Sequence, residues 1–546
     1  MKISPIFILL FFSSILGFSS HYNFILSQPV QQVWVRTYDS LPGSSSSMAL
    51  DSMQNIIVTG TIQLTGGRTD WCTIKYSTAG VQSWTDIYDG IPTSNGINSP
   101  TATGVDQQGN IYVTGYSERS GFGTDDYCTI KYNSNGVQQW ISKYNTGIGS
   151  KNDASAIAID NSRNVYVTGY STGNGTGYDI ATIKYNSNGD SLWVRRYDDP
   201  QHLDDVAYSI ALDNSGNVFV CGGIGNTNSI LTIKYNSSGA QQWVNFGGMG
   251  FLKKIKIDNN GNSFVTGIEQ IGTILYYVTI KYNSNGVQQW KSDYNYLGTN
   301  YSSDYSNDLA LDNQGNVFVT GRSLGSETNW DYATIKYNSA GVQQWVQRYN
   351  GTGNDYDEAY TIFTDSIGNI YITGLTWGNG SNNCTTIKYS SSGVQQWLIS
   401  SNGTYGNGAG GNTILLDKQN NVYVSGGNAL NNSVYFLTIK YSQLNPINKI
   451  SEHFPQNFEL KQNYPNPFNP NTEIRYYLSN KSYVNLDIFD IVGRKICALI
   501  NCEQNAGEYK YNFNGSNLSS GIYLYRLTAL NDKENFTDSK IMILEK

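Results

Sequence analysis

Charged residues and histidines are scarce in this sequence. Only 14% of its 546 residues are charged, and the formal net charge is −7, whereas about 25% are charged in an average soluble domain. Nucleic-acid binding needs an excess of Lys and Arg on one face, so this balance argues against it. The only histidines are His21, His202 and His453, too few for most histidine-based zinc or Ser-His-Asp sites.

Long apolar runs are also missing beyond the N-terminus. Lys2 is followed by an apolar run, Ile3–Phe18, and then by small residues. This pattern predicts a secretory signal peptide over residues 1–27, cleaved after Ser20 or nearer Ser27. An uncleaved anchor helix is the alternative, although the run is shorter than the ~20 residues that a membrane span needs. We expect an exported mature protein without an integral membrane segment.

Cysteine is sparse as well, with six copies in the whole chain. That number is too small for a disulfide scaffold. Cys72 and Cys128 occupy one repeat position, at which other units carry small or aliphatic residues. We expect them to be buried thiols, and we expect Cys497 and Cys502 to be free.

Glycine, tyrosine and tryptophan are abundant, with 56, 42 and 11 copies. Glycine suits tight turns and aromatic residues suit strands, so the composition predicts an all-β fold. The tetrapeptide Thr-Ile-Lys-Tyr recurs every 47 to 56 residues, with its Lys at 75, 131, 184, 234, 281, 336, 388 and 440. Trp recurs in the same rhythm. An Asp also closes a short apolar strand in each of eight units: Asp51, Asp106, Asp160, Asp213, Asp258, Asp312, Asp365 and Asp417.

The unit 307–349 shows how each repeat is built. Its pattern predicts four strands, Asn307–Asp312, Val317–Gly321, Tyr332–Tyr337 and Val342–Tyr349, with turn residues between them. Four short strands per repeat are typical of a β-propeller blade. A two-sheet sandwich is the alternative, but it would not repeat one unit eight times.

The order of the strands predicts how the ring closes. Val33–Tyr38 precedes every other strand, and the last unit, Thr413–Tyr441, has three strands without a Trp strand after it. The N-terminal strand can therefore complete the last blade and cover the edges that an open array would expose. We predict an eight-bladed, alternatively seven-bladed, β-propeller over residues 28–443.

With these units in view, the array resembles the bacterial SBBP propeller repeats. The resemblance spans roughly residues 30–443 and depends on units such as 213–222 (DNSGNVFVCG) and 181–185 (ATIKY). It implies extracellular proteins of seven or eight blades without shared catalytic residues. The chain departs from the pattern where Gln54 and Arg163 stand in place of the usual turn glycine.

The C-terminal part, residues 455–546, lacks the repeat. It contains a Pro-Asn-Pro-Phe box, a Gly-Arg-Lys turn and a Ser-Gly-Ile-Tyr strand in that order. It resembles a type A C-terminal sorting domain of the type IX secretion system, with matching positions at Pro465, Asn466, Pro467, Phe468, Gly493 and Gly521.

That resemblance implies a small immunoglobulin-like β-sandwich and a Bacteroidota-type bacterium. Its implied partners are the type IX translocon and a sortase-like C-terminal signal peptidase, which leaves the cargo released or attached at the surface. Residues 444–454, with Pro446 and few apolar side chains, are predicted to form the linker in which cleavage falls.

Ligand-binding candidates come from the longer, variable loops. The short repeated turns should lie on one face of the propeller and the variable loops on the other, where function usually resides. Aromatic and acidic residues of these loops suit sugar or peptide binding, and we take as candidates Trp71, Asp126, Trp330, Asp331 and Trp377. Alternatively, the loops are solvated and their aromatics cover strand ends. The shared repeat position of the two Asp favours a structural role for them.

The repeated charged residues have simpler explanations than catalysis. Each repeat Asp is expected to accept N–H bonds of its own turn, and each repeat Lys is expected to pair with a repeat Asp across blades. A calcium loop would need several oxygen ligands in one turn. Quinoprotein dehydrogenases are also eight-bladed and tryptophan-rich, but they need adjacent cysteines, which this chain lacks. We expect neither a cofactor nor a metal ion.

The preferred function is a non-catalytic, secreted or outer-surface binding or adhesion protein that presents loops to an extracellular glycan or protein. A secreted hydrolase or lyase acting on polysaccharide is the alternative, in which paired loop carboxylates serve as general acid and base. A structural surface component without a discrete ligand is a third reading.

Overall fold

The computed structural model describes residues 30–90, 96–119, 124–147, 149–225, 229–297, 303–378, 380–443, 448–451, 457–515, 518–531 and 535–545. The predicted signal peptide lies outside these residues. The described chain is almost entirely β-strand, with one short 3₁₀ helix, η1 (Thr65–Gly67). None of its helices has the length and apolarity that a membrane crossing requires.

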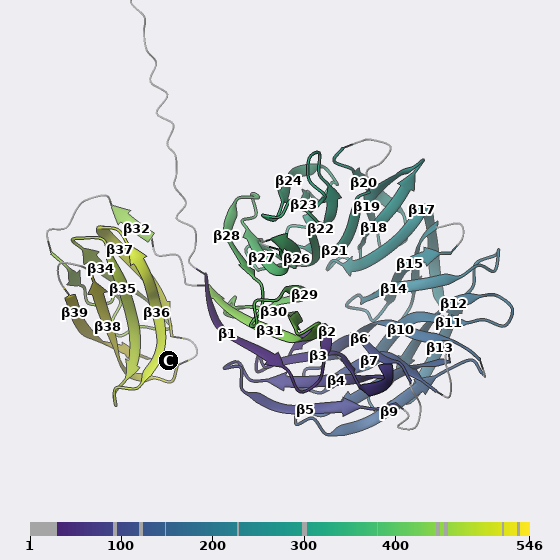
Figure 1. The fold of residues 1–546 in the computed structure, drawn as a ribbon, viewed down its shortest axis with the longest axis horizontal. Coiled ribbons are helices and arrows are strands. Elements are labelled where there is room, and N and C mark those ends of the chain that lie inside the picture. The colour runs from purple at the N-terminus through teal and green to yellow at the C-terminus, as the bar shows by residue number, and fades with distance from the viewer. Residues whose placement is uncertain are drawn as a thin grey trace, which may run out of the picture.

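The repeats form blades of four antiparallel strands around a central axis (Figure 1). The first three blades contain β2 Gly43–Leu50, β3 Ile56–Gln63, β4 Thr69–Tyr76, β5 Gln82–Tyr88, β6 Asn98–Val105, β7 Ile111–Glu118, β8 Asp125–Tyr132, β9 Gln138–Tyr144, β10 Asn152–Ile159, β11 Val165–Thr172, β12 Tyr178–Tyr185 and β13 Ser191–Tyr197. The sixth and seventh contain β21 Tyr305–Leu311, β22 Val317–Leu324, β23 Trp330–Tyr337, β24 Gln343–Tyr349, β25 Glu358–Thr364, β26 Ile370–Gly378, β27 Ser381–Tyr389 and β28 Gln395–Ser401.

The fourth and fifth blades share one long strand, β17 (Gln241–Ile257). Its first half pairs with β16 and its second half with β18, so that no loop separates the two blades. This accounts for the short repeat at this point of the sequence. The other strands of the two blades are β14 Asp205–Leu212, β15 Val218–Ile224, β16 Ser229–Tyr235, β18 Ser263–Ile271, β19 Ile274–Tyr282 and β20 Gln288–Tyr294.

The N-terminal strand closes the ring, as predicted. In the eighth blade β1 (Val30–Tyr38) is hydrogen-bonded to β31 (Ser433–Gln443), followed by β30 (Val422–Leu430) and β29 (Ala409–Leu416). The innermost strands of successive blades contact one another around the axis, including β29 with β2. The prediction of eight blades is therefore confirmed.

A repeated tryptophan joins each blade to the next. Trp140 packs between Tyr112 of its own blade and Tyr185 of the next, at ring distances of 6.0 and 6.3 Å. Its indole N–H donates to the carbonyl of Ser187 in the next blade, 3.1 Å away. Gly189 lies against the ring with φ of 88°, and a Cβ there would be 2.7 Å from it. Burial of the ring, its hydrogen bond and the glycine turn together set the spacing of the blades.

The repeat Asp residues hold turns, as predicted. Asp106 Oδ1 accepts the N–H groups of Gln108 and Asn110 at 2.9 Å, and its Oδ2 accepts the Asn110 amide. The same side-chain to backbone bond recurs in all eight turns. These oxygens therefore satisfy backbone donors.

The repeat Lys residues differ from the prediction. Lys75 pairs with Asp51 of its own blade at 2.9 Å. Lys75 and most of the others also reach across to the next blade, where they donate to a turn carbonyl, as Lys234 does to Ser284 at 2.8 Å. The prediction of Lys–Asp pairs between blades is therefore wrong, because these lysines donate to a carbonyl in the second turn of the next blade instead.

The C-terminal residues form two four-stranded sheets packed as a sandwich. The sheets contain β32 Asn448–Ser451, β33 Glu459–Leu460, β34 Asn471–Leu478, β35 Ser482–Asp490, β36 Lys495–Gln504, β37 Gly507–Asn514, β38 Gly521–Leu530 and β39 Asn535–Leu544. Strand β32 pairs with β37, so residues 448–451 of the predicted 444–454 linker belong to this sandwich. The remaining linker residues lie outside the described ranges.

The predicted sorting motif supports the sandwich. Phe468 is 2% exposed and packs edge-on against Phe513. Asn466 accepts the Ile543 N–H at 2.8 Å. Between them Pro467 is exposed, as is Pro465. Gly493 adopts a φ of 82° in the turn after β35, and Gly521 begins β38.

Candidate binding surface

Two of the predicted tryptophans come together on the variable-loop face of blades six and seven. Asp357 is fully buried between them. Its backbone N–H donates to the backbone carbonyl of Trp330 at 2.7 Å, and its side-chain Oδ1 accepts the backbone N–H of Trp377 at 2.8 Å. Burial raises the pKa of Asp357 to about 6. Both indole rings are half-buried, so they retain surface that a ligand can contact.

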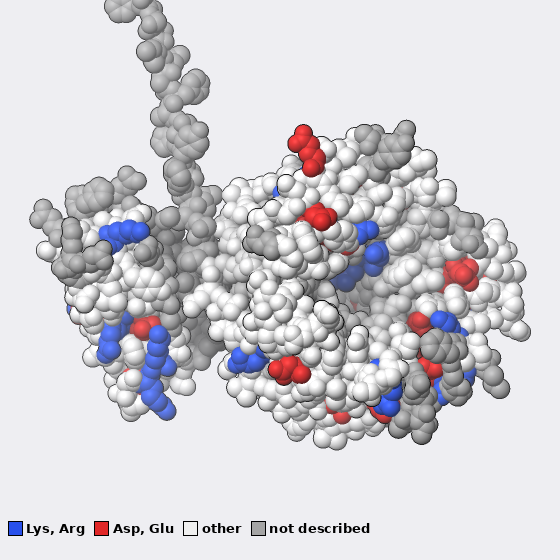
Figure 2. Space-filling model, in the orientation of Figure 1, with Lys and Arg blue, Asp and Glu red and all other residues white. Residues whose placement is uncertain are grey.

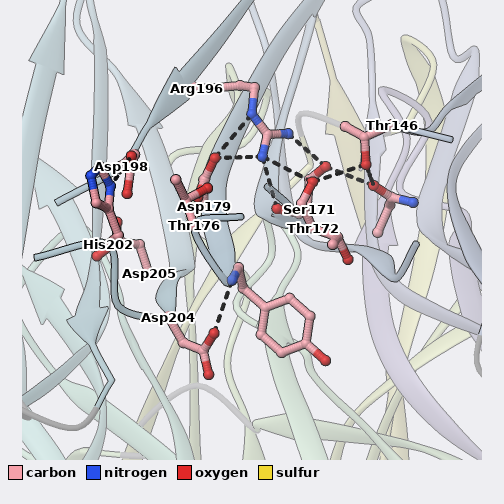
Figure 3. Close-up of polar contacts among 12 residues, drawn as sticks. Thr146, Ser171, Thr172, Thr176, Asp179, Arg196, Asp198, His202, Asp204 and Asp205 are labelled. Carbon is pink, nitrogen blue, oxygen red and sulfur yellow. Dashed lines mark hydrogen bonds and ion pairs between the residues drawn. The ribbon is translucent and has the colours of Figure 1, made fainter. Parts of the chain in front are cut away.

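Asp331 follows Trp330 but has a structural partner. It is 6% exposed and forms an ion pair with Arg348 at 2.8 Å. The third blade repeats this arrangement, in which Arg196 binds Asp179 and the Ser171 hydroxyl (Figure 3). A contact that recurs in two blades is part of the scaffold, and Asp331 is therefore not free to bind a ligand.

Trp71 and Asp126 lie elsewhere, on blades one and two. Trp71 is 1% exposed, donates its N–H to the Tyr116 carbonyl at 3.1 Å and packs edge-on against Tyr88. Asp126 is 3% exposed and lies 3.9 Å from Arg119. Burial leaves neither side chain available to a ligand, and the five predicted residues do not form one site.

Arg322 was missed by the sequence analysis and organises the surface around Trp330. Its guanidinium carbon lies 4.3, 5.1 and 5.3 Å from the ring centroids of Tyr305, Trp330 and Tyr356, respectively. It also pairs with Glu358 at 3.2 Å. Its Nε is buried and lacks a hydrogen-bond partner among the described residues. Three aromatic faces around a cation make a rigid polar-aromatic surface.

Three lysines, also missed, lie on the inner strand of the fifth blade. Lys253, Lys254 and Lys256 are on the second half of β17, which lines the central channel. Figure 2 shows Lys and Arg side chains gathered in the hollow at the centre of the ring. The inner strands of the other seven blades contain neither Lys nor Arg.

The three lysines differ in their contacts with neighbouring side chains. Lys254 is 3.6 Å from Asp308, and Lys253 contacts the Asn307 side chain at 3.4 Å. Lys256 has no ion-pair partner among the described residues, and it replaces the small or apolar residues that line the channel at this level in the other blades. Burial lowers the pKa of Lys253 and of Lys256. We call Lys253, Lys254 and Lys256 the channel lysines.

A second cluster of titratable groups lies on the loop side of blades two and three. Burial, and then the charge of Asp153, raise the pKa of Asp125 to about 6, with smaller effects of Lys151 and Glu118. Burial also raises the pKa of Asp153, whose Oδ2 accepts the Tyr170 hydroxyl. A carboxyl group with a pKa near neutrality is chemically suited to proton transfer.

Hollows also occur on the turn face, between neighbouring blades. One of about 430 Å³ is lined by the Asp160 and Asp213 turns, and one of about 360 Å³ by the Asp258 and Asp312 turns. Their walls are the repeated turns, so they differ little from blade to blade. The distinctive chemistry lies on the channel and loop face.

These features define an eight-bladed, all-β propeller joined to a small β-sandwich. Residues 462–544 match the family model described as a secretion system C-terminal sorting domain, and residues 141–175 and 295–327 match that of the beta-propeller repeat SBBP. The protein is thus an SBBP-type propeller carrying a type IX secretion sorting domain, exported to the cell surface or the extracellular space. The sorting domain implies handling by the type IX secretion system.

Solved structures resemble the fold at low identity. PorZ, an essential bacterial surface component of the type-IX secretion system of Porphyromonas gingivalis, is 13% identical with a TM-score of 0.38, over 90% of this chain and 69% of its own. Sqt1 from Chaetomium thermophilum is 8% identical with a TM-score of 0.49, over 75% and 99%. The polysaccharide lyase Uly1 is 13% identical with a TM-score of 0.33, over 69% and 93%. No curated protein matches the chain.

Proposed function

We propose that the protein is a non-catalytic binding protein that takes up an acidic polysaccharide at the mouth of its central channel. The observation that carries this proposal is the channel lysines, which are unique to one blade in a protein of net charge −7. Positive charge within a concave, low-dielectric wall focuses the field and attracts anions.

The neighbouring surface suits sugar rings. Trp330 and Tyr356 present aromatic faces beside Arg322, and Arg322 is held in place by Glu358. Aromatic faces pack against the apolar face of a sugar, and a guanidinium attracts a carboxylate or sulfate. The ligand class that fits both features is a polymer of uronic acid or sulfated sugars.

Binding of polygalacturonate and chondroitin sulfate, with neutral laminarin as the control glycan, tests the proposal. Saturable binding of an acidic glycan should weaken at least about tenfold in the double variant Lys253→Ala, Lys256→Ala, and should weaken with rising salt. The matched control is Lys418→Ala, on an exposed turn of the opposite face. Equal affinity for acidic and neutral glycans, or equal binding by both variants, would contradict the proposal.

A polysaccharide-cleaving enzyme is the second candidate, favoured by Asp125, Asp153 and Tyr170. Two carboxyl groups of raised pKa beside a phenol can supply an acid and a base. Incubation with the same glycans would reveal new reducing ends or unsaturated products. Product formation that is lost in Asp125→Asn but kept in the channel-lysine variant would favour the enzyme over the binding protein.

A further inference from the structure

Three carboxylates converge in the loop that joins the third and fourth blades. Oxygen atoms of Asp198, Asp199 and Asp205 all lie within 4.8 Å of one another. Oxygens bound to one Ca²⁺ at about 2.3–2.6 Å can be no more than about 5 Å apart, so this trio has the span of a single ion. Figure 3 shows Asp198 and Asp205 beside His202, on the far side of Asp179 from Arg196.

Two oxygens of this trio are buried and lack a hydrogen-bond partner among the described residues. Asp205 is fully buried, and its Oδ2 accepts the Asp199 N–H at 2.7 Å, whereas its Oδ1 has no hydrogen-bond partner in the described part of the chain. The Oδ1 of Asp198 is likewise buried without a partner, while its Oδ2 binds the His202 ring at 2.7 Å. Leaving such acceptors unsatisfied is destabilising, most of all for charged groups.

Other blades show what this position does without a ligand. Asp304 and Asp357 stand at the register position of Asp205 in blades six and seven. Both oxygens of Asp304 accept backbone N–H groups, at 2.9 Å, and both oxygens of Asp357 do so too. In the fourth blade the corresponding N–H, that of Gly225, donates to the Asp204 carbonyl instead, and two more carboxylates, Asp198 and Asp199, lie beside Asp205.

The nearest strong cation does not neutralise the trio. Arg196 is engaged by Asp179 at 2.6 Å and by the Ser171 hydroxyl. Among the described residues no Lys or Arg forms an ion pair with the trio, and His202 contacts Asp198 alone, so much of the negative charge of the trio is not compensated there.

We propose that Asp198, Asp199 and Asp205 bind one Ca²⁺ ion, which fastens the connection between the third and fourth blades. The donors are all carboxylate oxygens, the ligands that Ca²⁺ prefers, and water supplies the remaining positions. An exported protein meets calcium at concentrations that fill sites with dissociation constants near 10⁻⁴–10⁻³ M. The expectation of no metal ion came from the repeat Asp turns, and this loop lies outside them.

Calcium titration of the full chain, freed of divalent ions by a chelator, tests the proposal. Calorimetry should give one site per chain, and saturating CaCl₂ should raise the unfolding midpoint by roughly 2 to 5 °C. Asp198→Asn should weaken binding at least about tenfold. Its position is only partly buried, so the variant should fold, and the wild-type titration is informative in any case.

The matched control is Asp357→Asn, at the same register position in blade seven. It should change the unfolding midpoint but keep the calcium response, because its carboxylate already accepts two backbone N–H groups. Absence of heat and of a thermal shift in the wild-type protein up to about 10 mM CaCl₂ would overturn the site. An unchanged calcium response in Asp198→Asn would overturn its location, and an equal response to MgCl₂ would overturn the assignment to calcium.

Discussion

Trp34 lies where the eighth blade meets the first and the ring closes. Its replacement by alanine tests whether this contact holds β1 in place as well as packing two blades together. It lies on β1, is 7% exposed, and packs between Tyr423 of the eighth blade and Tyr76 of the first, at 6.1 and 6.4 Å. Its N–H donates to the Thr78 carbonyl at 3.2 Å. Truncating a buried Trp to Ala costs about 3–5 kcal/mol, a large share of the 5–15 kcal/mol typical of a folded protein.

Trp140→Ala is the matched control, because its two ring contacts and its hydrogen bond have nearly the same lengths. Both variants should lose similar stability in denaturant titrations. Only Trp34→Ala should release β1, since that strand has no covalent connection to its blade partner β31. Limited proteolysis followed by mass spectrometry should then show rapid cleavage within 30–42 for Trp34→Ala alone. Equal cleavage in the two variants, or none in either, would refute the closure argument.

Three further predictions concern a turn residue, a buried carboxyl group and the processing of the exported chain. Arg163 has a φ of 66° at a position where five of the eight repeat Asp turns have Gly, so Arg163→Gly should stabilise the chain by about 1 kcal/mol in denaturant titration; destabilisation would contradict this. The pKa of Asp125 is raised to about 6, so the folded state holds this proton more tightly than the unfolded state does. The contribution of Asp125 to the free energy of unfolding therefore falls as the pH rises from about 4 to 6, and it is constant above pH 6. Asp125→Asn should therefore be more stable than the parent by roughly 2 kcal/mol at pH 8 but not at pH 4. The intact mass of the exported protein should lack the signal peptide and the C-terminal sandwich; a full-length exported chain would contradict that processing.

The number of blades was predictable because the repeated residues make the contacts that build a propeller. Each Trp needs the Tyr of the next Thr-Ile-Lys-Tyr unit, as Trp140 needs Tyr185, so counting units counts interfaces. The unpaired N-terminal Trp strand similarly required a partner at the other end of the array. The Lys partners were mispredicted because residue spacing along the chain does not show which atom of the next blade Lys234 meets, and that atom is a turn carbonyl.

The candidate site was only partly predictable, because the position of a residue within the repeat decides whether its side chain is buried. Trp71 and Tyr127 occupy the same position in their blades, directly after Asp70 and Asp126, respectively. Both side chains are buried. Alignment of the repeats would have identified Trp71 as scaffold. Trp330 stands one position before its Asp, outside that buried register, and keeps exposed surface. The channel lysines could have been found from the sequence, since three Lys within β17 contrast with the absence of Lys and Arg from every other inner strand.

Departure from the repeat is therefore the most informative guide to function in this protein. Residues that recur, such as Asp331 with its counterpart Asp179, are each committed to an arginine that recurs with them. A group that occurs in one blade alone has no such scaffold partner to explain it. The channel lysines, the caged Arg322 and the Asp205 trio are all of this kind, and each leaves a charged or polar atom without a protein partner among the described residues. These three places are therefore where we propose that an external ligand or ion supplies the missing interaction.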